Sequence, residues 1–526
     1  MNKLKIGIIT NGKFVDKYTY ELAEWLKSNN KLFEFNCFIS ISKDKKNLKI
    51  NKILKKILFK FIIFFENLIL KFTKKHSDHL SKFNIKNIVR KEIKVNKTKE
   101  KKYDIKDLQN VKSEKFDILI RSCSNVLNKD FLNLSKYGII SFHHGDYAKF
   151  RGSPAGFWEV FKKEKSTGFM IQTINRRLDY GNILLEGFFQ TKSFFLLNQA
   201  ELYKKSNFYL KKILIDFSKN RKFLFLKKRK KGKVYETPKI NNQVKYLFNT
   251  IKILTKKIFF KNYNFKLAKI EVNKIIDPII VKNDKNKFLA DPFLINHNDK
   301  IFCFAEEYDQ IKKKGHIVFF DYSKKQSNKK IVLSENFHLS FPFIFKYKKD
   351  FFMCPETSDI SEIRLYKSIN FPFEWKYYKT IMKNINSADN IIFKHNNLWW
   401  LFTNIDRSNS GDFSNDFSIF YSKTNPLTNK WKSHPQNPIL INSLFSRNAG
   451  MIIKKNKLIR ISQVQGFDNY GEDINFNEIK LLNTKKYKEQ LFKNKNYIKI
   501  KKRLNNPNIH HYSEINDNII IDFKTN

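Results

Sequence analysis

Two titratable groups, a histidine and an aspartate, stand at the ends of two predicted strands in the first half of the chain. His143, followed by His144, ends the apolar run 139–142, and Asp179 ends the next apolar segment, which opens at Thr167-Gly168. In α/β enzymes, neighbouring strands deliver such groups to one edge of the sheet, where they exchange protons with a substrate. The positions therefore predict that His143 and Asp179 form an acid–base pair.

The surrounding segments have the pattern of an α/β sheet that can position this pair. Residues 3–10 read as a buried strand and lead through Asn11-Gly12 into an amphipathic helix around 18–27. Residues 116–121 form another apolar strand, and 198–217 have helical periodicity. The first strand is not followed by G-x-G-x-x-G, so a dinucleotide site is not supported. We expect a Rossmann-like α/β domain.

The second half of the chain is β-rich and repetitive. From about residue 270, an apolar strand, a polar turn and a second strand recur about every fifty residues. The first strands of four such units contain Ala290-Asp291-Pro292, Phe341-Pro342-Phe343, Ala388-Asp389-Asn390 and Asn448-Ala449-Gly450. A further unit includes His510-His511-Tyr512-Ser513 with residues 519–523. All-β repeats of this period are typical of a propeller, and their number predicts five blades.

The stretch 138–185 resembles the catalytic core of the folate-dependent formyltransferases, which include methionyl-tRNA formyltransferase and sugar N-formyltransferases. That family has Asn-x-His after a strand, a loop ending in Arg-Gly, a Thr-Gly strand and Leu-Asp-x-Gly. Here His143 matches the catalytic histidine, Arg151-Gly152 the loop end, Thr167-Gly168 the strand and Asp179 the catalytic aspartate. The resemblance covers residues 1 to about 215.

The resemblance implies a reaction in which an amine attacks the formyl carbon of formyl-tetrahydrofolate. His143 would stabilise the oxyanion, and Asp179 would accept the amine proton and keep the imidazole charged. Ser141 stands where the family has its catalytic asparagine, and loss of one oxyanion donor typically costs on the order of a hundredfold in rate. Arg151, Gly152 and the additional polar residues His144 and Asp146 are candidates for binding the cosubstrate.

The repeats resemble the amino-terminal region of plant glucosamine inositolphosphorylceramide transferase and, more distantly, the five-bladed arabinanase and xylosidase glycosidases. In those glycosidases, carboxylates from the innermost strands meet at the central axis. The resemblance makes Asp291, Glu356 and Asp389, placed at comparable points of three consecutive repeats, candidates for a sugar site with base, modulator and acid roles. Glu306 and Glu307 are expected to be solvated or bonded to nearby lysines.

These features lead to one main hypothesis and two alternatives. The main hypothesis is a formyltransferase that acts on an amine, most simply an amino sugar of glycan or glycolipid biosynthesis, with the propeller holding carbohydrate. Because of Ser141, the first domain can instead be a catalytically degenerate module that only binds. The third reading gives the propeller glycosidase or glycosyltransferase activity.

Composition restricts the partners. The net charge is +53, but Lys, Asn, Ile and Phe are enriched together, as in proteins from AT-rich genomes, and the basic run 227–233 has no interleaved aromatic residue, which argues against nucleic acid. The four cysteines lack C-x-x-C spacing, so we expect no metal site and a reducing cytoplasmic location. A small-molecule or glycan substrate is the expected partner.

One apolar segment, 53–72, leaves two readings open. Lys60, Glu66 and Lys71 interrupt it, so it is too short in uncharged residues to span a bilayer. It reads either as an amphipathic helix packed on the sheet or as a helix in peripheral contact with a membrane surface. The predicted organisation is a catalytic domain at 1–215, a basic linker or helical region at 216–265 and the propeller at 266–526.

Overall fold

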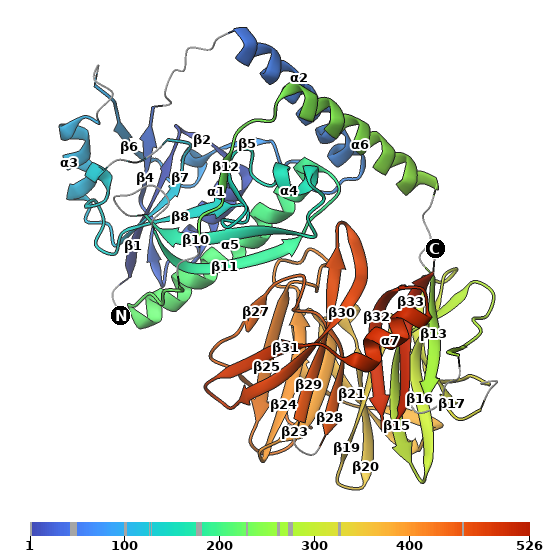
Figure 1. Cartoon of the computed structure of the whole chain (residues 1–526). Helices are drawn as coiled ribbons and strands as arrows, with labels where there is room; N and C mark the ends of the chain where they lie inside the picture. Colours follow the sequence, from blue (N-terminus) through green and yellow to red (C-terminus); the bar gives the residue numbers. More distant parts are fainter. Residues whose placement is uncertain are drawn as a thin grey trace. The chain divides into compact units, whose positions relative to one another are not determined.

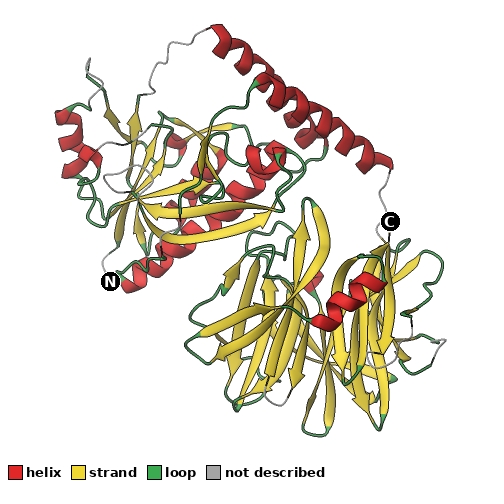
Figure 2. Cartoon of the chain, viewed as in Figure 1, coloured by secondary structure: helices red, strands yellow, loops and turns green. Residues whose placement is uncertain are grey.

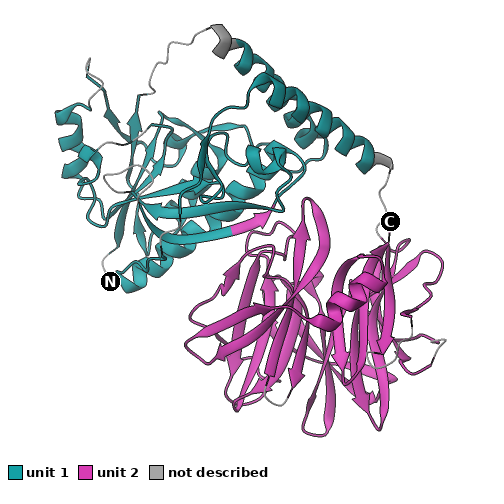
Figure 3. Cartoon of the chain, viewed as in Figure 1, with its two compact units in different colours: residues 1–187, 191–258 teal, residues 188–190, 259–526 magenta. Residues whose placement is uncertain are grey.

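The computed structural model describes residues 3–42, 50–98, 103–125, 127, 129–174, 181–227, 230–259, 264–271, 277–324, 328–454 and 457–525. The chain forms two compact units (Figure 3). Unit 1 comprises residues 1–187 and 191–258, and unit 2 comprises residues 188–190 and 259–526.

Unit 1 is built on an eight-stranded sheet in the order β11-β10-β8-β7-β1-β4-β6, with β3 paired to β1 (Figure 1). The strands are β1 (Leu4–Thr10), β3 (Phe33–Glu34), β4 (Cys37–Ile41), β6 (Lys91–Val95), β7 (Ile118–Ser122), β8 (Ile139–His144), β10 (Ser166–Thr173) and β11 (Asn182–Gln190). Strands β6, β4, β1, β7 and β8 are parallel, and β10 is antiparallel to β8. The predicted α/β class is confirmed.

Among the described residues of unit 1, six α-helices, two 3-10 helices (Ile85–Asn87 and Lys129–Phe131) and four short strands accompany this sheet. The helices are α1 (Lys17–Ser28), α2 (Ile50–Phe72), α3 (Ile105–Ser113), α4 (Phe157–Phe161), α5 (Phe195–Asn220) and α6 (Ile240–Phe259). The short strands are β2 (Phe14–Asp16), β5 (Lys82–Asn84), β9 (Phe150–Gly152) and β12 (Lys233–Tyr235). β2 pairs with β5 and β9 with β12, so residues beyond 215 contribute both β12 and α6 to this unit.

The start of α5 is capped by a carboxylate from another helix. Phe194, the N-cap residue, provides no side-chain cap. Instead, Glu66 of α2 accepts hydrogen bonds from the backbone N–H groups of Phe195 (3.3 Å) and Leu196 (2.7 Å), and Tyr246 of α6 donates to the same carboxylate. Complete burial raises the pKa of Glu66 to about 7. One acidic side chain thus joins three helices.

Unit 2 consists almost entirely of strands, as Figure 2 shows, arranged as five sheets. Four blades are formed by consecutive strands: β15 (Lys287–His297), β16 (Lys300–Asp309), β17 (Lys314–Asp321) and β18 (Lys330–Leu333); β19 (Ser340–Tyr347), β20 (Asp350–Glu356), β21 (Glu362–Asn370) and β22 (Glu374–Lys383); β23 (Ser387–His395), β24 (Leu398–Ile405), β25 (Asp416–Ser422), β26 (Lys432–Ser433) and β27 (Leu440–Ile441); β28 (Asn448–Lys454), β29 (Lys457–Gly466), β30 (Asn469–Leu482) and β31 (Tyr487–Phe492). Helix α7 (Lys495–Arg503) follows the last of them.

The fifth blade is shared between the two ends of this unit. Its order is β14-β13-β33-β32, where β13 (Asn264–Glu271) and β14 (Ile279–Ile280) come first in the chain and β32 (Asn508–Ile515) and β33 (Asn518–Thr525) come last. β13 pairs with β33 along its whole length. The strands β15, β19, β23, β28 and β32 contact one another in a closed ring. The predicted five-bladed propeller is confirmed.

All five of these innermost strands carry a break in register at the same point. In β15, β19, β23 and β28 the residue at the break has a positive φ: Asp291 (49°), Phe341 (46°), Asp389 (53°) and Gly450 (123°). β32 is irregular between Ile509 and His511. A β-bulge bends a strand and turns a side chain in a new direction.

Candidate functional site

The parallel strands β7 and β8 bring Arg121 and Ser141 together at one edge of the sheet. Arg121 Nη1 donates a hydrogen bond to Ser141 Oγ (3.3 Å), and its Nε and Nη2 donate to the carbonyl oxygen of Asn125 (3.1 and 2.7 Å). The Ser141 hydroxyl in turn donates to the carbonyl oxygen of Phe142 (3.3 Å). The serine is therefore occupied on both sides, and a guanidinium group lies beside it.

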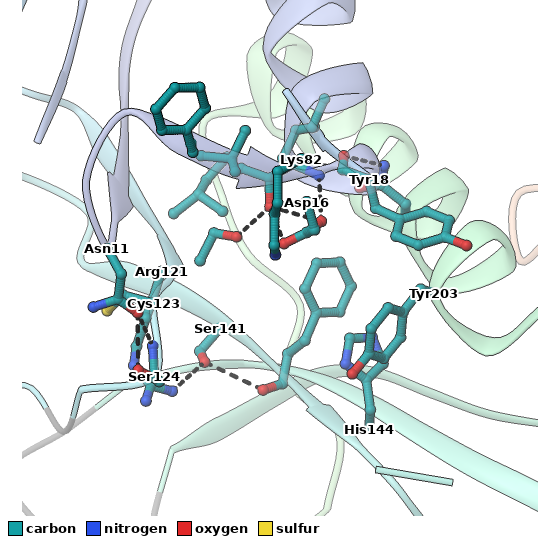
Figure 4. A pocket seen from close by; sticks show the side chains of 18 residues that line it. Asn11, Asp16, Tyr18, Lys82, Arg121, Cys123, Ser124, Ser141, His144 and Tyr203 are labelled. Carbon is teal, nitrogen blue, oxygen red and sulfur yellow. Dashed lines mark hydrogen bonds between the residues drawn. The ribbon is translucent and has the colours of Figure 1, made fainter. Parts of the chain in front are cut away.

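A pocket of about 440 Å³ opens at this edge (Figure 4). Tyr18, Phe142 and Tyr203 give it aromatic surfaces. Its polar lining includes Asn11, Asp16, Arg121, Ser141, His144 and Asn207. The wall is mixed, with more polar than apolar surface, which suits a small molecule rich in hydrogen-bonding groups. The volume lies in the usual range of ligand pockets, about 300–1,000 Å³.

His144 forms part of the pocket wall. Its ring stacks on Phe142, with centroids 4.9 Å apart, and lies 4.3 Å from the ring of Tyr203. Its Nε2 is hydrogen-bonded to Ser206 Oγ (3.0 Å). Burial, assisted by the charge of His143, lowers the pKa of His144 to about 3, so the imidazole is neutral at pH 7.

His143 points to the opposite face of β8, because side chains alternate along a strand. Its ring meets Tyr147 edge to face, with centroids 5.5 Å apart. The guanidinium carbon of Arg151 lies 5.6 Å from the centre of the same tyrosine ring, and Arg151 Nη1 donates to the carbonyl oxygen of Gly232 (3.4 Å). The two histidines of the motif therefore have separate surroundings. Asp179 lies outside the described residues.

Glu159 of α4 approaches His143 and was not anticipated from the sequence. A Cβ atom on Gly145 would lie 3.4 Å from Glu159 Oε1 and 3.8 Å from His143 Nε2, so carboxylate and imidazole converge on one backbone position. Oε1 also accepts a hydrogen bond from the Asp146 N–H (3.2 Å). Glu159 is 1% exposed, and burial raises its pKa to about 7. The available signal was an acidic residue inside the otherwise apolar run Phe157–Phe161.

The other cosubstrate candidates shape the loop after β8. Asp146 Oδ1 accepts from the Ala148 N–H (2.9 Å). A Cβ on Gly168 would lie 2.7 Å from the Asp146 Cα, so the Thr-Gly motif allows β10 to pass close to this loop. Gly152 lies in β9, in register with Tyr235 of β12. Of the four candidates, only His144 lines the pocket, and a binding role for Asp146, Arg151 and Gly152 stays a prediction.

In unit 2, an arginine binds two of the three predicted sugar-site carboxylates. Arg447 Nε lies 2.6 Å from Asp389 Oδ2, and Nη2 lies 3.8 Å from Glu356 Oε2. The guanidinium also lies over the ring of Tyr470, 4.9 Å from its centre. Burial, together with the neighbouring Asp389, raises the pKa of Glu356 to about 7. The sequence analysis placed Asn448-Ala449-Gly450 in a repeat but assigned no role to Arg447, which directly precedes it.

The third carboxylate, Asp291, belongs to a buried group around His510. His510 Nδ1 lies 2.8 Å from Asp522 Oδ2 and 3.5 Å from Asp291 Oδ1, and its Nε2 is hydrogen-bonded to Tyr470 (2.7 Å). Burial alone lowers the pKa of His510, but the two carboxylates raise it above its usual value. Burial also raises the pKa of Asp291 to about 7. Asp291, His510 and Asp522 offer ligand atoms within 4.8 Å of one another, a spacing that could hold a metal ion. The ion pairs of His510 with the two aspartates already account for the close approach of these three side chains.

The three predicted carboxylates occupy two kinds of position. Asp291 and Asp389 lie at the bulges of first strands, whereas Glu356 ends the second strand β20, opposite Ser340. The equivalent residue of the preceding blade is Glu306, opposite Ala290. The expectation that Glu306 is solvated or bonded to lysine was wrong: it is 7% exposed, and burial, with Asp291 and Glu356 nearby, raises its pKa well above the usual range.

Glu307, the residue after Glu306, is bonded to lysines, as expected. Glu307 is ion-paired with Lys287 and Lys329, each at 2.9 Å, and hydrogen-bonded to His316. Adjacent residues of a strand face opposite sides, which separates the two glutamates.

The sequences of known families match the two units separately. Residues 65–193 match the formyl transferase family, and residues 273–518 match the amino-terminal family of glucosamine inositolphosphorylceramide transferase 1. The chain joins these two domains. His143 and His144, with the residues around each of them, lie in the formyl transferase domain. The propeller is the second domain.

Individual relatives agree with this division. The chain is 34% identical over 210 residues to glucosamine inositolphosphorylceramide transferase 1 of Arabidopsis thaliana, covering 39% of this chain and 27% of that protein. It is 33% identical over 82 residues to methionyl-tRNA formyltransferase of Clostridium perfringens, covering 16% of this chain and 26% of that enzyme. The match thus spans about a quarter of the length of each relative.

Among solved structures, the catalytic domain of a Coprinopsis cinerea GH62 alpha-L-arabinofuranosidase is similar at 13% identity and a TM-score of 0.32, covering 43% of this chain and 74% of that domain. A score this low does not establish a common fold.

In the part of the chain described by the structure, no helix is both long enough and apolar enough to cross a bilayer.

Proposed function

We propose that this protein is a formyltransferase that moves a formyl group from formyl-tetrahydrofolate to an amine, with an amino sugar as acceptor and the propeller as a carbohydrate-binding domain. The observation that carries the proposal is the position of His143. It is the penultimate residue of β8, within the segment that matches the formyl transferase family and two residues after Ser141, which Arg121 contacts. Strand ends of this kind are where open α/β sheets place their ligands.

The proposed reaction requires little covalent chemistry from the protein. The acceptor amine forms a bond to the formyl carbon, the bond from that carbon to the folate nitrogen breaks, and one proton passes from the amine to the folate nitrogen. His143 would donate a hydrogen bond to the formyl oxygen as negative charge develops there. Asp179 would take the amine proton. Glu159, held beside His143, would orient the imidazole as a positioning residue.

The pocket fits part of formyl-tetrahydrofolate. Tyr18 and Tyr203 provide aromatic surface for a flat ring system, and Asp16 and Asn11 provide hydrogen-bonding groups for its ring nitrogens. Arg121 would serve as the charged donor beside Ser141. These residues would hold the ring system of the cosubstrate. The formyl group would have to extend past Ser141 to the face of β8 that carries His143, because His143 does not line this pocket.

The test is turnover by the full chain with formyl-tetrahydrofolate and a panel of amino-sugar nucleotides, followed by release of tetrahydrofolate. We expect turnover with at least one acceptor. His143→Ala and Asp179→Ala should each lower kcat by about a hundredfold or more. His395→Ala, at a turn of unit 2 far along the chain, is the matched control and should be unchanged. Absence of formyl-tetrahydrofolate binding, or full activity in the His143→Ala, Asp179→Ala double variant, would refute the assignment.

A second activity, glycoside cleavage in the propeller, is favoured by one arrangement. Glu356, with its pKa raised to about 7, has the character of a general acid, and Asp389 is held by Arg447 as a paired carboxylate. Release of sugar by the full chain from a panel of aryl glycosides, lost in Glu356→Gln, would support it. If the panel is inert and glycans still bind, the propeller is a binding domain, as the main proposal has it.

A further inference from the structure

Helix α2 exposes a row of large apolar side chains on its outer face. Six of them have exposed fractions between 37% and 86%: Leu54, Ile57, Phe61, Phe64, Leu68 and Phe72. They follow one another at intervals of three or four residues, so they form one stripe along the helix. The opposite face is the packed one, where Ile62, Glu66 and Leu70 are at most 2% exposed. The earlier reading of this helix as packed on the fold therefore describes only half of its surface.

Helix α6 carries a second stripe of the same kind. Ile240, Val244, Phe248 and Ile251 are exposed at intervals of three or four residues, and Gln243, Tyr246 and Thr250 are buried behind them. The two helices lie side by side, as Figure 1 shows. Gln243 Nε2 donates to the carbonyl oxygen of Lys55 (3.0 Å), and Tyr246 donates to Glu66. The stripes therefore sit on one connected helical pair.

The polar residues beside the stripes are basic. The exposed lysines of α2 and α6 include Lys56, Lys60, Lys71, Lys245, Lys252, Lys256 and Lys257. On a helical wheel, most of them fall next to the apolar stripe rather than opposite it. The sequence of α6 contains no acidic residue, and the one acidic residue of α2, Glu66, is buried and bonded inside the fold. The exposed face of each helix thus combines apolar side chains with positive charge.

Charge decides which partner this surface fits. A second copy of the chain related by a two-fold axis would place the same face against itself, and lysine rows would then meet lysine rows. An anionic lipid surface attracts those lysines, and its headgroup–acyl boundary accepts Phe and Leu side chains from a helix lying in the plane. We propose that α2 and α6 bind the surface of an anionic bilayer, with the two stripes inserted at the boundary. This inference does not depend on the proposed formyl transfer.

The experiment measures binding of the full chain to vesicles of phosphatidylcholine alone and of phosphatidylcholine mixed with phosphatidylserine, by flotation. We expect binding to the mixed vesicles to be at least about tenfold tighter. Phe61→Glu with Phe64→Glu should lower binding to the mixed vesicles by about tenfold or more, because the apolar insertion is lost. Lys56→Glu with Lys60→Glu should remove the preference for phosphatidylserine.

The matched control is Ile105→Glu, a 72% exposed apolar residue of α3 that lies on neither stripe, and its binding should equal that of the unmodified chain. Thermal unfolding of each variant checks that it folds. Absence of binding to either vesicle, or binding unchanged by the two phenylalanine substitutions, would overturn the proposal. So would a dimer in solution that these substitutions dissociate, since a second copy would then cover the stripes.

Discussion

The two candidate sites of this protein are built in contrasting ways. At the edge of the unit 1 sheet, the groups come from one short stretch of chain, and His143 and His144 face opposite sides of a single strand. In unit 2, Arg447 pairs with Asp389 of another repeat in the interior, and Asp291 lies beside His510 of the last repeat. The first site is local in sequence and lies beside an open pocket; the second is dispersed and largely satisfied by its own ion pairs.

This contrast separates groups available for a substrate from groups that also maintain the fold. A buried charge that loses its partner is costly, so removing one member of the Arg447 cluster should destabilise the fold, whatever the intact cluster contributes. His144, by contrast, is a neutral imidazole held by a hydrogen bond to Ser206 and by the rings of Phe142 and Tyr203. Substitutions should therefore affect stability in unit 2 and catalysis in unit 1.

The largest effect is expected for Arg447→Met. Removing the guanidinium leaves Asp389, whose side chain is 2% exposed, without its ion-pair partner. The free energy of unfolding, measured by denaturant with circular dichroism, should fall by about 3–5 kcal/mol. Lys376→Ala, which breaks the exposed pair with Glu374, is the control and should cost about 1 kcal/mol or less. Equal losses in the two variants would show that the buried pair contributes no more to stability than an exposed one, which would contradict the structural role given to the Arg447 cluster.

A somewhat smaller, pH-dependent effect is expected at Glu159. Its pKa is about 7 in the folded chain, against an ordinary value of 4.5, because the carboxylate is buried. Its contribution to stability is therefore complete below about pH 4.5 and is lost as the pH rises through about 7. Relative to Glu159→Gln, the unmodified chain should lose roughly 3 kcal/mol of unfolding free energy across that interval. Parallel stability curves for the two proteins would contradict this account of Glu159.

The smallest effect is expected at Ser141. Its hydroxyl already donates to the Phe142 carbonyl, so Ser141→Ala should lower formyl transfer by only about two- to threefold. Arg121→Gln, which removes the adjacent charge, should lower it by about tenfold. The assay is single-turnover release of tetrahydrofolate. A larger loss in Ser141→Ala than in Arg121→Gln would mean that the serine itself is the donor that replaces the family's asparagine.

The fold was predictable from the sequence because the motifs that identify each domain are formed by residues close together in the chain. The motifs from His143 to Gly181 lie in one stretch, and the propeller repeats share the same apolar strand beginnings at Ala290 and Ala388. The site was predictable only where it is equally local. The roles of His143, Asp179 and the three propeller carboxylates stay predictions.

The groups that escaped notice depend on long-range packing. Arg121 reaches Ser141 only because β7 and β8 are neighbours. Glu159 comes near His143, at Gly145, only because α4 lies against the loop after β8. Glu306 and Glu307 are adjacent residues of β16, so their side chains face opposite sides of the sheet. Two neighbouring glutamates in a sequence do not indicate which of them faces the interior. The apolar stripe of α2 has the residue pattern of a face that packs in a core. The sequence alone does not indicate whether another element covers it.

The shared fifth blade has a consequence for synthesis of the chain. Strand β13 pairs with β33, which the ribosome adds about 250 residues later, on the order of ten to fifty seconds at typical elongation rates. During that time Ile270, buried in the finished propeller against residues of β32 and β33, lacks those strands, whereas Leu267 can already pack against the next blade. One side of the nascent propeller therefore exposes apolar surface until its last strand is made, whereas the formyl transferase domain ahead of it is already complete when β13 emerges.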